Sequence, residues 1–453
     1  MKKPLIKILP LLLGGILFAQ NKQDSIQFKR ISDEILINEQ AYSNLYDLTK
    51  NIGHRLSGSE SYEKATKWAF NKLKEAGADK VWYQEVMVPV WVRGKESLQI
   101  KTTKGQWKKL NMLSLGNSEG TKGQDLTAEI ILVKSFDEFN KLSEADVKGK
   151  IVFFNYSFNQ TFISTGQAYG DAGKYRSTTA SLVAKKGGKA VIIRSLSSSF
   201  DDVPHTGMMR YQEGIEKIPA VAIGPKSADE LEKTLKSEKI LAKLNSNCTM
   251  KPDKLSHSVI GEITGKKDQS VIVVGGHLDS WDVGEGASDD GTGIVQSIEI
   301  LRTFKKLNLQ NNHTIRVVCF ANEENGVKGG KKYKEEAQKN NEKHLFAIES
   351  DGGGFTPRGF GLDMKEDKRR QIQSWASLFF PYGIYDFTKT YSGTDVEPLN
   401  ELDVPTAELV PDSQRYFDIH HTAEDTFEKV NRREMLLGAV AMGQLIYMID
   451  KNW

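Results

Sequence analysis

Residues 271–293, VIVVGGHLDSWDVGEGASDDGTG, decide the fold of this chain. The stretch begins with the apolar run Val271–Val274, which is typical of a strand buried on both faces. Two glycines end the run, and His277 and Asp279 follow beyond it. A glycine-rich loop then leads to Asp289, and a helical pattern begins shortly afterwards. Because open α/β sheets bind ligands beyond the carboxyl ends of their strands, an imidazole and carboxylates placed there indicate a metal site.

The composition is that of a globular protein. The chain has 453 residues, of which 39% are hydrophobic and 27% are charged, and its length is sufficient for two domains. The 62 basic and 59 acidic residues leave a formal net charge of +3. Such a balanced count gives no reason to expect nucleic acid or a membrane surface as a partner.

Residues 1–20 have the layout of a secretory signal peptide. Three lysines precede the apolar run Ile8–Phe18, and Ala19 offers a small residue for cleavage. The alternative is a membrane anchor, but the apolar run is too short to span a bilayer comfortably. We therefore expect an exported protein, periplasmic or secreted, that keeps no membrane attachment after cleavage.

The two cysteines, Cys248 and Cys319, leave the redox state open. An exported protein with two cysteines could form one disulfide bond. Cys319, however, lies in the apolar run Ile315–Phe320, where a buried free thiol is equally compatible with the pattern. Two cysteines are too few for a structural zinc site made of thiolates.

From Ser258 onward, strands and helices alternate. Strands are expected at Ser258–Thr264, Val271–Gly275, Thr314–Phe320, Leu345–Glu349 and Thr406–Val410. Helices are expected at about Gly293–Lys306, Gly329–Asn340, Lys368–Phe379 and Arg432–Ile449. This alternation predicts an α/β fold with a doubly wound sheet.

A different pattern occupies residues 121–250. The stretches KGKIV at Lys148–Val152, GGKAVII at Gly187–Ile193 and IPAVAI at Ile218–Ile223 resemble those of a protease-associated domain. The segment contains one histidine, His205, and no cluster of metal-ligand residue types. We therefore expect an inserted domain that covers or shapes a site built by the rest of the chain.

Further polar residues follow the other predicted strands. Glu323 and Glu324 come after one strand, Asp351 after another, and His420 and His421 after the last. Each feature alone is weak, because paired glutamates are usually solvated and an aspartate before glycines is usually a turn residue. Together with the first stretch, however, they put imidazoles and carboxylates at one edge of one sheet. So many buried carboxylates are unfavourable unless cations compensate them.

The motifs GGHLDS, DDGTG, NEENG, ESDGG and HHTAEDT, in this order, resemble those of the co-catalytic zinc aminopeptidase and glutamate carboxypeptidase superfamily. The likeness runs from about Asp47 to the C-terminus. It implies a zinc-peptidase sheet domain formed by residues 21–120 and 251–453, on either side of the insertion. It also implies an exopeptidase that hydrolyses short peptides, in particular dipeptides with free termini, and that forms a homodimer.

The resemblance also assigns roles to individual residues. The ligands of two zinc ions would be His277, Asp289, Glu324, Asp351 and His421. Asp289 would bridge the two ions, and Glu324 and Asp351 would each complete one of them. Glu323 would act as the general base toward metal-activated water. Asp279 would accept a hydrogen bond from His277 and fix its tautomer.

Several alternatives remain open at this level. Asp290 could replace Asp289 as the ligand, and His420 could replace His421, although the motif spacing of the family that the chain resembles implies Asp289 and His421. His54 is expected to be structural rather than a ligand. An aminopeptidase acting on longer peptides is the main alternative function. A non-catalytic receptor-like protein and a single-zinc glutaminyl cyclase are disfavoured by the complete set of ligand residues.

Overall fold

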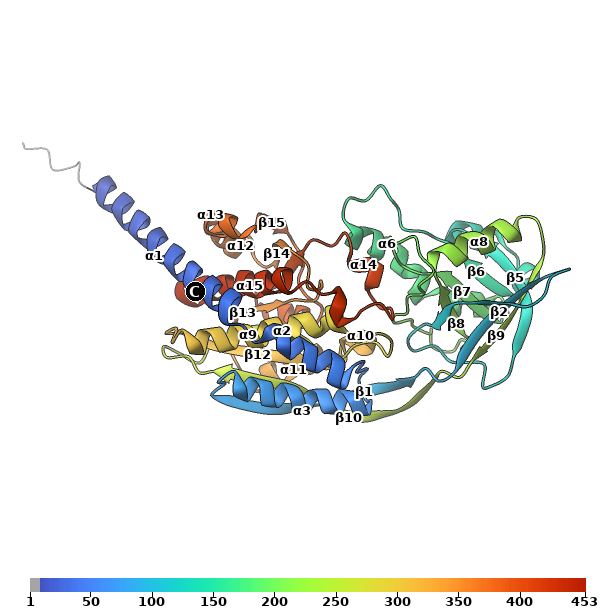
Figure 1. Cartoon of the computed structure of the whole chain (residues 1–453), viewed down its shortest axis with the longest axis horizontal. Coiled ribbons are helices and arrows are strands. Elements are labelled where there is room, and N and C mark those ends of the chain that lie inside the picture. The colour runs from blue at the N-terminus through green and yellow to red at the C-terminus, as the bar shows by residue number, and fades with distance from the viewer. Residues whose placement is uncertain (1–8) are drawn as a thin grey trace, which may run out of the picture.

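The computed structural model describes residues 9–453, which form two lobes, each built on an eight-stranded sheet (Figure 1). In spatial order, the strands of the first sheet are β1 (Lys80–Val92), β10 (Thr249–Ile263), β12 (Thr314–Phe320), β11 (Val271–His277), β13 (His344–Glu349), β16 (Thr406–Pro411), β14 (Pro357–Asp363) and β15 (Asp386–Lys389). β12, β11, β13 and β16 run parallel to one another. β1 pairs antiparallel with β10, β10 with β12, and β14 with β16, whereas β14 and β15 are parallel. The predicted α/β fold is confirmed, and the sheet is mixed with a parallel centre.

Helices cover both faces of the first sheet. One face carries α1 (Leu9–Asn38), α2 (Ala41–Tyr46), α3 (Glu60–Glu75), α9 (Thr292–Lys306) and α15 (Arg432–Asn452), and the other carries α11 (Lys328–Lys339) and η4 (Glu397–Leu402). Successive side chains of a strand point to opposite faces. Ile272 and Val274 of β11 therefore join the first core, and Val271 and Val273 join the second. Because both faces of β11 are covered, the residues of this run are all apolar and do not alternate with polar ones.

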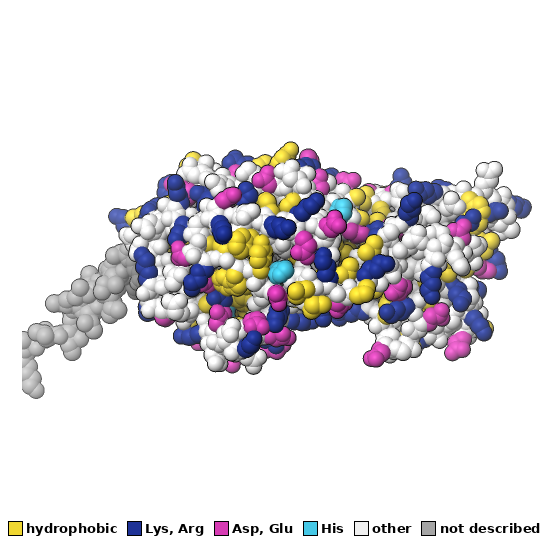
Figure 2. Space-filling view, turned by 90° about the horizontal axis from the view of Figure 1, so that it is seen from below, with side chains coloured by type: hydrophobic (Ala, Val, Ile, Leu, Met, Phe, Trp, Pro, Cys, Tyr) yellow, Lys and Arg dark blue, Asp and Glu magenta, His cyan; other side chains and the backbone are white. Residues whose placement is uncertain are grey.

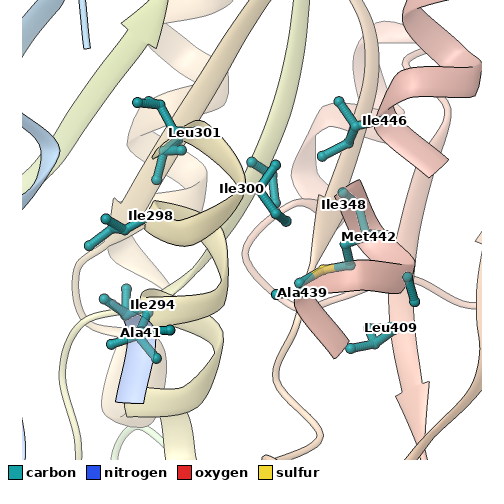
Figure 3. Packing of buried hydrophobic residues seen from close by; sticks show 14 of the residues in the cluster. Ala41, Ile294, Ile298, Ile300, Leu301, Ile348, Leu409, Ala439, Met442 and Ile446 are labelled. Carbon is teal, nitrogen blue, oxygen red and sulfur yellow. The ribbon is translucent and has the colours of Figure 1, made fainter. Parts of the chain in front are cut away.

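α9, the helix that follows β11 and η2 (Ala287–Gly291), is anchored in the hydrophobic core. Ile300 of α9 lies in one buried cluster with Ile348 of β13 and with Met442 and Ile446 of α15 (Figure 3). Full burial of one such side chain contributes about 1.5–3 kcal/mol. α9 thereby holds one end of the loop between β11 and α9 in a fixed position, and His277 at the end of β11 holds the other.

The first lobe also contains several shorter helical elements. They are η1 (Asp47–Ile52), η2 (Ala287–Gly291), α10 (Glu323–Gly326), α12 (Glu366–Ser374), α13 (Ala376–Phe379), η3 (Phe380–Tyr382), α14 (Tyr416–Ile419) and η5 (Phe427–Lys429). The predicted helix Lys368–Phe379 is thus two helices, because α12 ends at Ser374 and α13 begins at Ala376.

The second lobe contains the other sheet. In spatial order, its strands are β3 (Lys108–Leu110), β2 (Glu96–Thr102), β9 (Ile240–Ser246), β5 (Leu126–Val133), β6 (Ile151–Phe154), β7 (Ala190–Arg194), β8 (Ala220–Ile223) and β4 (Met112–Ser114). Its helices are α4 (Phe136–Lys141), α5 (Glu144–Val147), α6 (Thr165–Ser177), α7 (Thr179–Lys185) and α8 (Pro225–Leu235). β2, β3 and β4 precede the expected boundary at residue 121. They join this sheet because β2 pairs with β9 and β4 pairs with β8, contacts that the local pattern does not reveal.

The N-terminal region begins with the long helix α1. Residues 1–8 of the expected signal peptide lie outside the described residues. Farther along α1, Phe28, Ile31 and Ile35 are buried in the core of the first lobe. Among the described residues, no helix has the length and apolarity needed to cross a bilayer.

Both cysteines are buried free thiols. Cys319 is in β12 and belongs to the core of the first lobe, whereas Cys248 packs near Trp91 and Trp281. The structure therefore favours the second of the two possibilities that the sequence left open, and no disulfide links them.

The surface carries both signs of charge. On the face shown in Figure 2, lysine and arginine side chains are interspersed with aspartate and glutamate side chains. This distribution agrees with the near balance of 62 basic and 59 acidic residues.

Candidate metal centre

The predicted ligand residues lie together at the carboxyl edge of the first sheet. His277 is the last residue of β11, and Asp289 lies in η2, just before α9. Glu324 lies in α10 beyond β12, Asp351 follows β13, and His421 follows α14. Since β11 is hydrogen-bonded to both β12 and β13, residues just beyond these three strands are necessarily close in space.

Asp289 stands between two imidazoles. Its Oδ1 lies 3.1 Å from His277 Nε2, and its Oδ2 lies 3.3 Å from His421 Nε2. Each imidazole nitrogen faces one further carboxylate: Asp351 Oδ1 is 3.2 Å from His277 Nε2, and Glu324 Oε2 is 3.1 Å from His421 Nε2. The five side chains thus form two groups of three donors that share the carboxylate of Asp289.

The two neighbouring residues that the sequence left eligible are placed differently. Asp290 also lies within reach of His277 and Asp351. Its oxygens, however, accept the backbone N–H groups of His277 at 3.1 Å and of Gly293 at 2.9 Å. His420 Nε2 is 3.6 Å from Asp289 Oδ2, and the ring of His420 stacks on that of His421 with centroids 3.5 Å apart. His421 alone of this pair also faces Glu324, so the geometry favours Asp289 and His421.

Asp279 is placed differently from the expectation. Its backbone carbonyl oxygen accepts the hydrogen bond from His277 Nδ1 at 3.0 Å, whereas its carboxylate Oδ1 is 3.8 Å from that nitrogen. The carboxylate Oδ1 instead accepts the backbone N–H of Glu323 at 3.1 Å. The turn after β11 brings the main chain under the imidazole, so Asp279 fixes the His277 tautomer through its carbonyl and positions Glu323 through its side chain.

A cavity of about 240 Å³ opens onto these residues. The first lobe supplies Asp289, Glu323, Glu324, Asp351, Thr394, Tyr416, Phe417, His420 and His421 to its wall, and the second lobe supplies Tyr169, Arg176 and Met208. The ring of Tyr169 stacks on that of Phe417 with centroids 4.6 Å apart. Figure 1 shows the corresponding helices, α6 and α14, facing each other where the lobes meet. The second lobe therefore closes one side of the site.

Comparison with known proteins identifies the family. The model of peptidase family M28 matches residues 258–444. Carboxypeptidase Q from Homo sapiens is 34% identical over 411 residues, which cover 90% of this chain and 85% of that protein. The chain belongs to peptidase family M28. Carboxypeptidase Q from Bos taurus is 33% identical over 463 residues and extends over 98% of this chain and 96% of its own length.

Solved structures agree with this assignment. The crystal structure of a peptidase M28 precursor from Shewanella amazonensis SB2B superposes with a TM-score of 0.90 at 31% identity, covering 95% of this chain and 97% of that one. A zinc aminopeptidase from Bacillus subtilis superposes with a TM-score of 0.64 at 20% identity, covering 90% of this chain and 93% of that one, which shows a shared fold. The protein is accordingly a zinc-dependent metallopeptidase of family M28.

The electrostatics of the M28 site call for cations. Burial, together with the nearby carboxylates of Asp351 and Asp279, raises the pKa of the Glu323 carboxyl to about 8 against the lowering effect of His277. Burial likewise raises the pKa of the Glu324 carboxyl, and the negative charge of Asp289 adds to this effect. Burial alone would lower the pKa of His277, but the surrounding carboxylates outweigh it and raise that pKa well above its usual value. Bound cations would relieve the repulsion among these carboxylates.

The donor set fits zinc. Two imidazoles and three carboxylates form two groups, and mixed nitrogen and oxygen ligands suit this ion. Burial and the positive charge of Arg176 lower the pKa of His421 well below its usual value, so its ring remains neutral and keeps a nitrogen lone pair for a metal. The residues present therefore match the group that the M28 family implies.

Two residues with no role assigned from the sequence support the metal loop, which is the segment of residues 278–291 between β11 and α9. Arg55 is fully buried and donates to the carbonyl oxygens of Leu278 at 2.6 Å, Glu285 at 2.9 Å and Gly286 at 2.9 Å. Asp425 is the second residue. Its carboxylate accepts the backbone N–H groups of Ser288 at 2.7 Å and Asp289 at 3.1 Å. Arg55 begins the stretch RLSGS, residues Arg55–Ser59, but nothing local to that stretch shows that its side chain reaches this loop.

Proposed function

We propose that this M28 peptidase is an exported di-zinc exopeptidase that hydrolyses short peptides, in particular dipeptides with free termini. The observation that carries the proposal is the position of Asp289, whose two oxygens face the imidazoles of His277 and His421 at 3.1 and 3.3 Å. A carboxylate oriented in this way can bridge two cations. His277 and Asp351 would complete one site, and His421 and Glu324 would complete the other.

Bound zinc would polarise the scissile carbonyl group and lower the pKa of a water molecule to about 7. The protein contributes the proton transfer. Glu323 lines the cavity beside the ligand carboxylates, and its backbone N–H is held by Asp279 at 3.1 Å. We assign to the Glu323 carboxylate the role of general base, which takes a proton from the attacking water. It then gives this proton to the leaving amine as the carbon–nitrogen bond breaks.

The size of the site supports small substrates. The cavity of about 240 Å³ is smaller than the roughly 300–1,000 Å³ typical of pockets for drug-sized ligands. The second lobe closes one side of it through Tyr169 and Met208. A peptide of a few residues suits such a space better than an extended chain. Carboxypeptidases Q from Homo sapiens and Bos taurus, which match over 90% and 98% of this chain, carry a name that agrees with exopeptidase action.

Export and domain division complete the proposal. The lysines and the apolar run within residues 1–20 support secretion. We further propose that the zinc-peptidase domain is interrupted by one insertion that forms the second lobe, with the insertion taken to include the strands from Glu96 to Ser246.

Metal analysis combined with a peptide panel tests the proposal. The purified protein should contain two zinc ions per chain, lose activity on exhaustive chelation and regain it when zinc is added. The panel consists of free dipeptides and the same dipeptides blocked at either end. Activity that survives exhaustive chelation, or a stoichiometry of one zinc per chain in the fully active protein, would contradict the di-zinc assignment. Equal cleavage of free and N-blocked dipeptides would contradict recognition of a free amine.

A further inference from the structure

A second cavity, of about 820 Å³, lies in the second lobe, apart from the metal centre. It opens at the carboxyl ends of β5, β6 and β7, which are parallel neighbours in the second sheet (Figure 1). None of its lining residues belongs to the cavity of about 240 Å³ at the metal centre. Its volume falls within the roughly 300–1,000 Å³ that is typical of pockets for small molecules. We refer to it as the second-lobe cavity.

The register of the three strands places a row of polar side chains along one side of the second-lobe cavity. Val133 of β5 pairs with Phe154 of β6, and Phe154 pairs with Ile193 of β7. The residues of the next row are Lys134, Asn155 and Arg194. Because parallel strands lie about 4.8 Å apart, these three side chains start side by side. The carboxyl edge of parallel strands is also where open α/β sheets bind their ligands.

Cations outnumber carboxylates in the wall. The four cationic side chains are Lys134, Arg194, Lys233 and Lys236, and the two carboxylates are Asp229 and Glu232. Glu232 accepts a hydrogen bond from Asn155 Nδ2 and pairs with Lys134 Nζ, each at 2.6 Å. Burial alone would raise the pKa of Glu232, but the hydrogen bonds from two lysines and Asn155 lower it to about 2. So low a pKa shows that this wall stabilises negative charge.

Arg194 and Lys233 keep donors that a ligand can use. The side chain of Arg194 is only 10% exposed, and its Nη1 donates to Asn155 Oδ1 at 3.2 Å and to Asp229. Its Nη2 donates to Asp229 at 3.4 Å, so these bonds fix the guanidinium and engage at most three of its five N–H groups. Among residues 9–453, no carboxylate lies within 4 Å of Lys233 Nζ. The charge of this lysine is therefore not compensated by a neighbour.

The loop that follows β6 forms the rest of the wall. It contributes Tyr156, Ser157, Phe158, Asn159 and Gln160. Phe158 is 4% exposed, and its ring packs edge-on against that of Phe417, with centroids 5.8 Å apart. Ring surface next to amide and hydroxyl groups can hold the uncharged body of a ligand, while the cations hold its charged end. Such a mixture of apolar surface and a few placed polar groups is usual in small-molecule sites.

We propose that the second-lobe cavity binds a small organic dianion through Arg194, Lys134 and Lys233. Four cations against two carboxylates leave two positive charges, which one phosphate monoester or one dicarboxylate balances. Both kinds of ligand present anionic oxygens that accept hydrogen bonds from guanidinium and ammonium groups. The inference goes beyond the proposed peptidase function, because none of these residues borders the metal centre.

The test titrates the zinc-loaded protein by calorimetry at constant ionic strength. The probes are glycerol 3-phosphate and glutarate, and their uncharged counterparts, glycerol and glutaramide, are the matched controls. Arg194→Gln and Lys233→Gln each remove one cation from the cavity. Lys239→Gln is the control variant, because this lysine is 80% exposed, pairs with Glu129 at 3.5 Å and lies outside the cavity wall. The melting temperature of each protein is also measured.

We expect one or both dianions to bind the wild-type protein saturably at one site per chain, and neither glycerol nor glutaramide to bind. Arg194→Gln and Lys233→Gln should each raise the dissociation constant ~10- to 100-fold, the range for one lost hydrogen bond between charged groups. Lys239→Gln should bind as the wild type does. Binding of glycerol 3-phosphate alone would identify a phosphoryl group as the ligand, and binding of glutarate alone would identify a pair of carboxylates.

Three results would overturn the inference. The first is the absence of saturable binding for both dianions. The second is equal affinity in the wild type, Arg194→Gln and Lys233→Gln, which is the result expected of an anion that binds only at the metal centre. The third is an equal loss in Lys239→Gln, which would indicate general attraction by surface charge. If Arg194→Gln lowers the melting temperature, Lys233→Gln alone decides, because Lys233 has no ion pair to lose within residues 9–453.

Discussion

Replacing Arg55 with lysine should weaken zinc binding by loosening the loop between His277 and Asp289. The arginine donates three hydrogen bonds, to the carbonyl oxygens of Leu278, Glu285 and Gly286. Lysine keeps the positive charge, but its compact ammonium group cannot reproduce the planar fork. With two of the three buried carbonyl groups left without a partner, at about 1–3 kcal/mol each, the native loop loses roughly 2–6 kcal/mol.

Part of this cost is relieved if the loop shifts, and any shift moves Asp289 relative to His277. We expect the zinc dissociation constant to rise ~10- to 100-fold, as is usual when a partner that orients metal ligands is lost. Competition with a chromophoric chelator measures the constant, and calorimetry measures the melting temperature. The matched control is Arg316→Lys, which disturbs a buried arginine paired with Glu262 at 2.9 Å and Glu342 at 2.8 Å.

The control should melt at a lower temperature than wild type but bind zinc with unchanged affinity. If Arg55→Lys behaves in the same way as Arg316→Lys, the reasoning is refuted. Arg55 would then stabilise the fold without setting the geometry of the ligands.

Three further predictions concern the base, the metal and the thiols. Glu323→Gln should retain its zinc by elemental analysis and lose ~10²- to 10⁴-fold in kcat, because an amide cannot accept the proton of the water; full activity would remove Glu323 from the mechanism. Chelation should lower the melting temperature, since zinc at 100 times its dissociation constant contributes about 2.7 kcal/mol for each site. Scanning calorimetry with and without chelator checks this, and an unchanged transition would mean that the carboxylates need no cation. Cys248 and Cys319 should react with iodoacetamide only after unfolding, as measured by mass spectrometry, because both thiols are buried. Burial also raises the pKa of each of the two thiols, so little reactive thiolate is present. A disulfide-linked peptide in a non-reduced digest would contradict their free state.

Much of the first lobe was predictable because its signals are local. The run Val271–Val274 indicated a strand buried on both faces, and β11 has that property. The polar residues after the strands indicated one edge of one sheet, because carboxyl ends of neighbouring parallel strands meet there. The family assignment is confirmed by the comparisons. The individual ligand roles stay predictions, although the structure brings all five side chains together.

The sequence by itself determined the central strands of the first sheet, the family and the set of residues able to hold metal, since each follows from periodicity or from a short motif. The tertiary structure alone decided four things. β2, β3 and β4 belong to the second sheet, and the carbonyl of Asp279 rather than its carboxylate meets His277. Arg176 reaches the cavity from another lobe, and Arg55 reaches the metal loop from more than 200 residues away in the chain. These facts depend on contacts between segments far apart in sequence, whose pairing is set by packing of the whole chain.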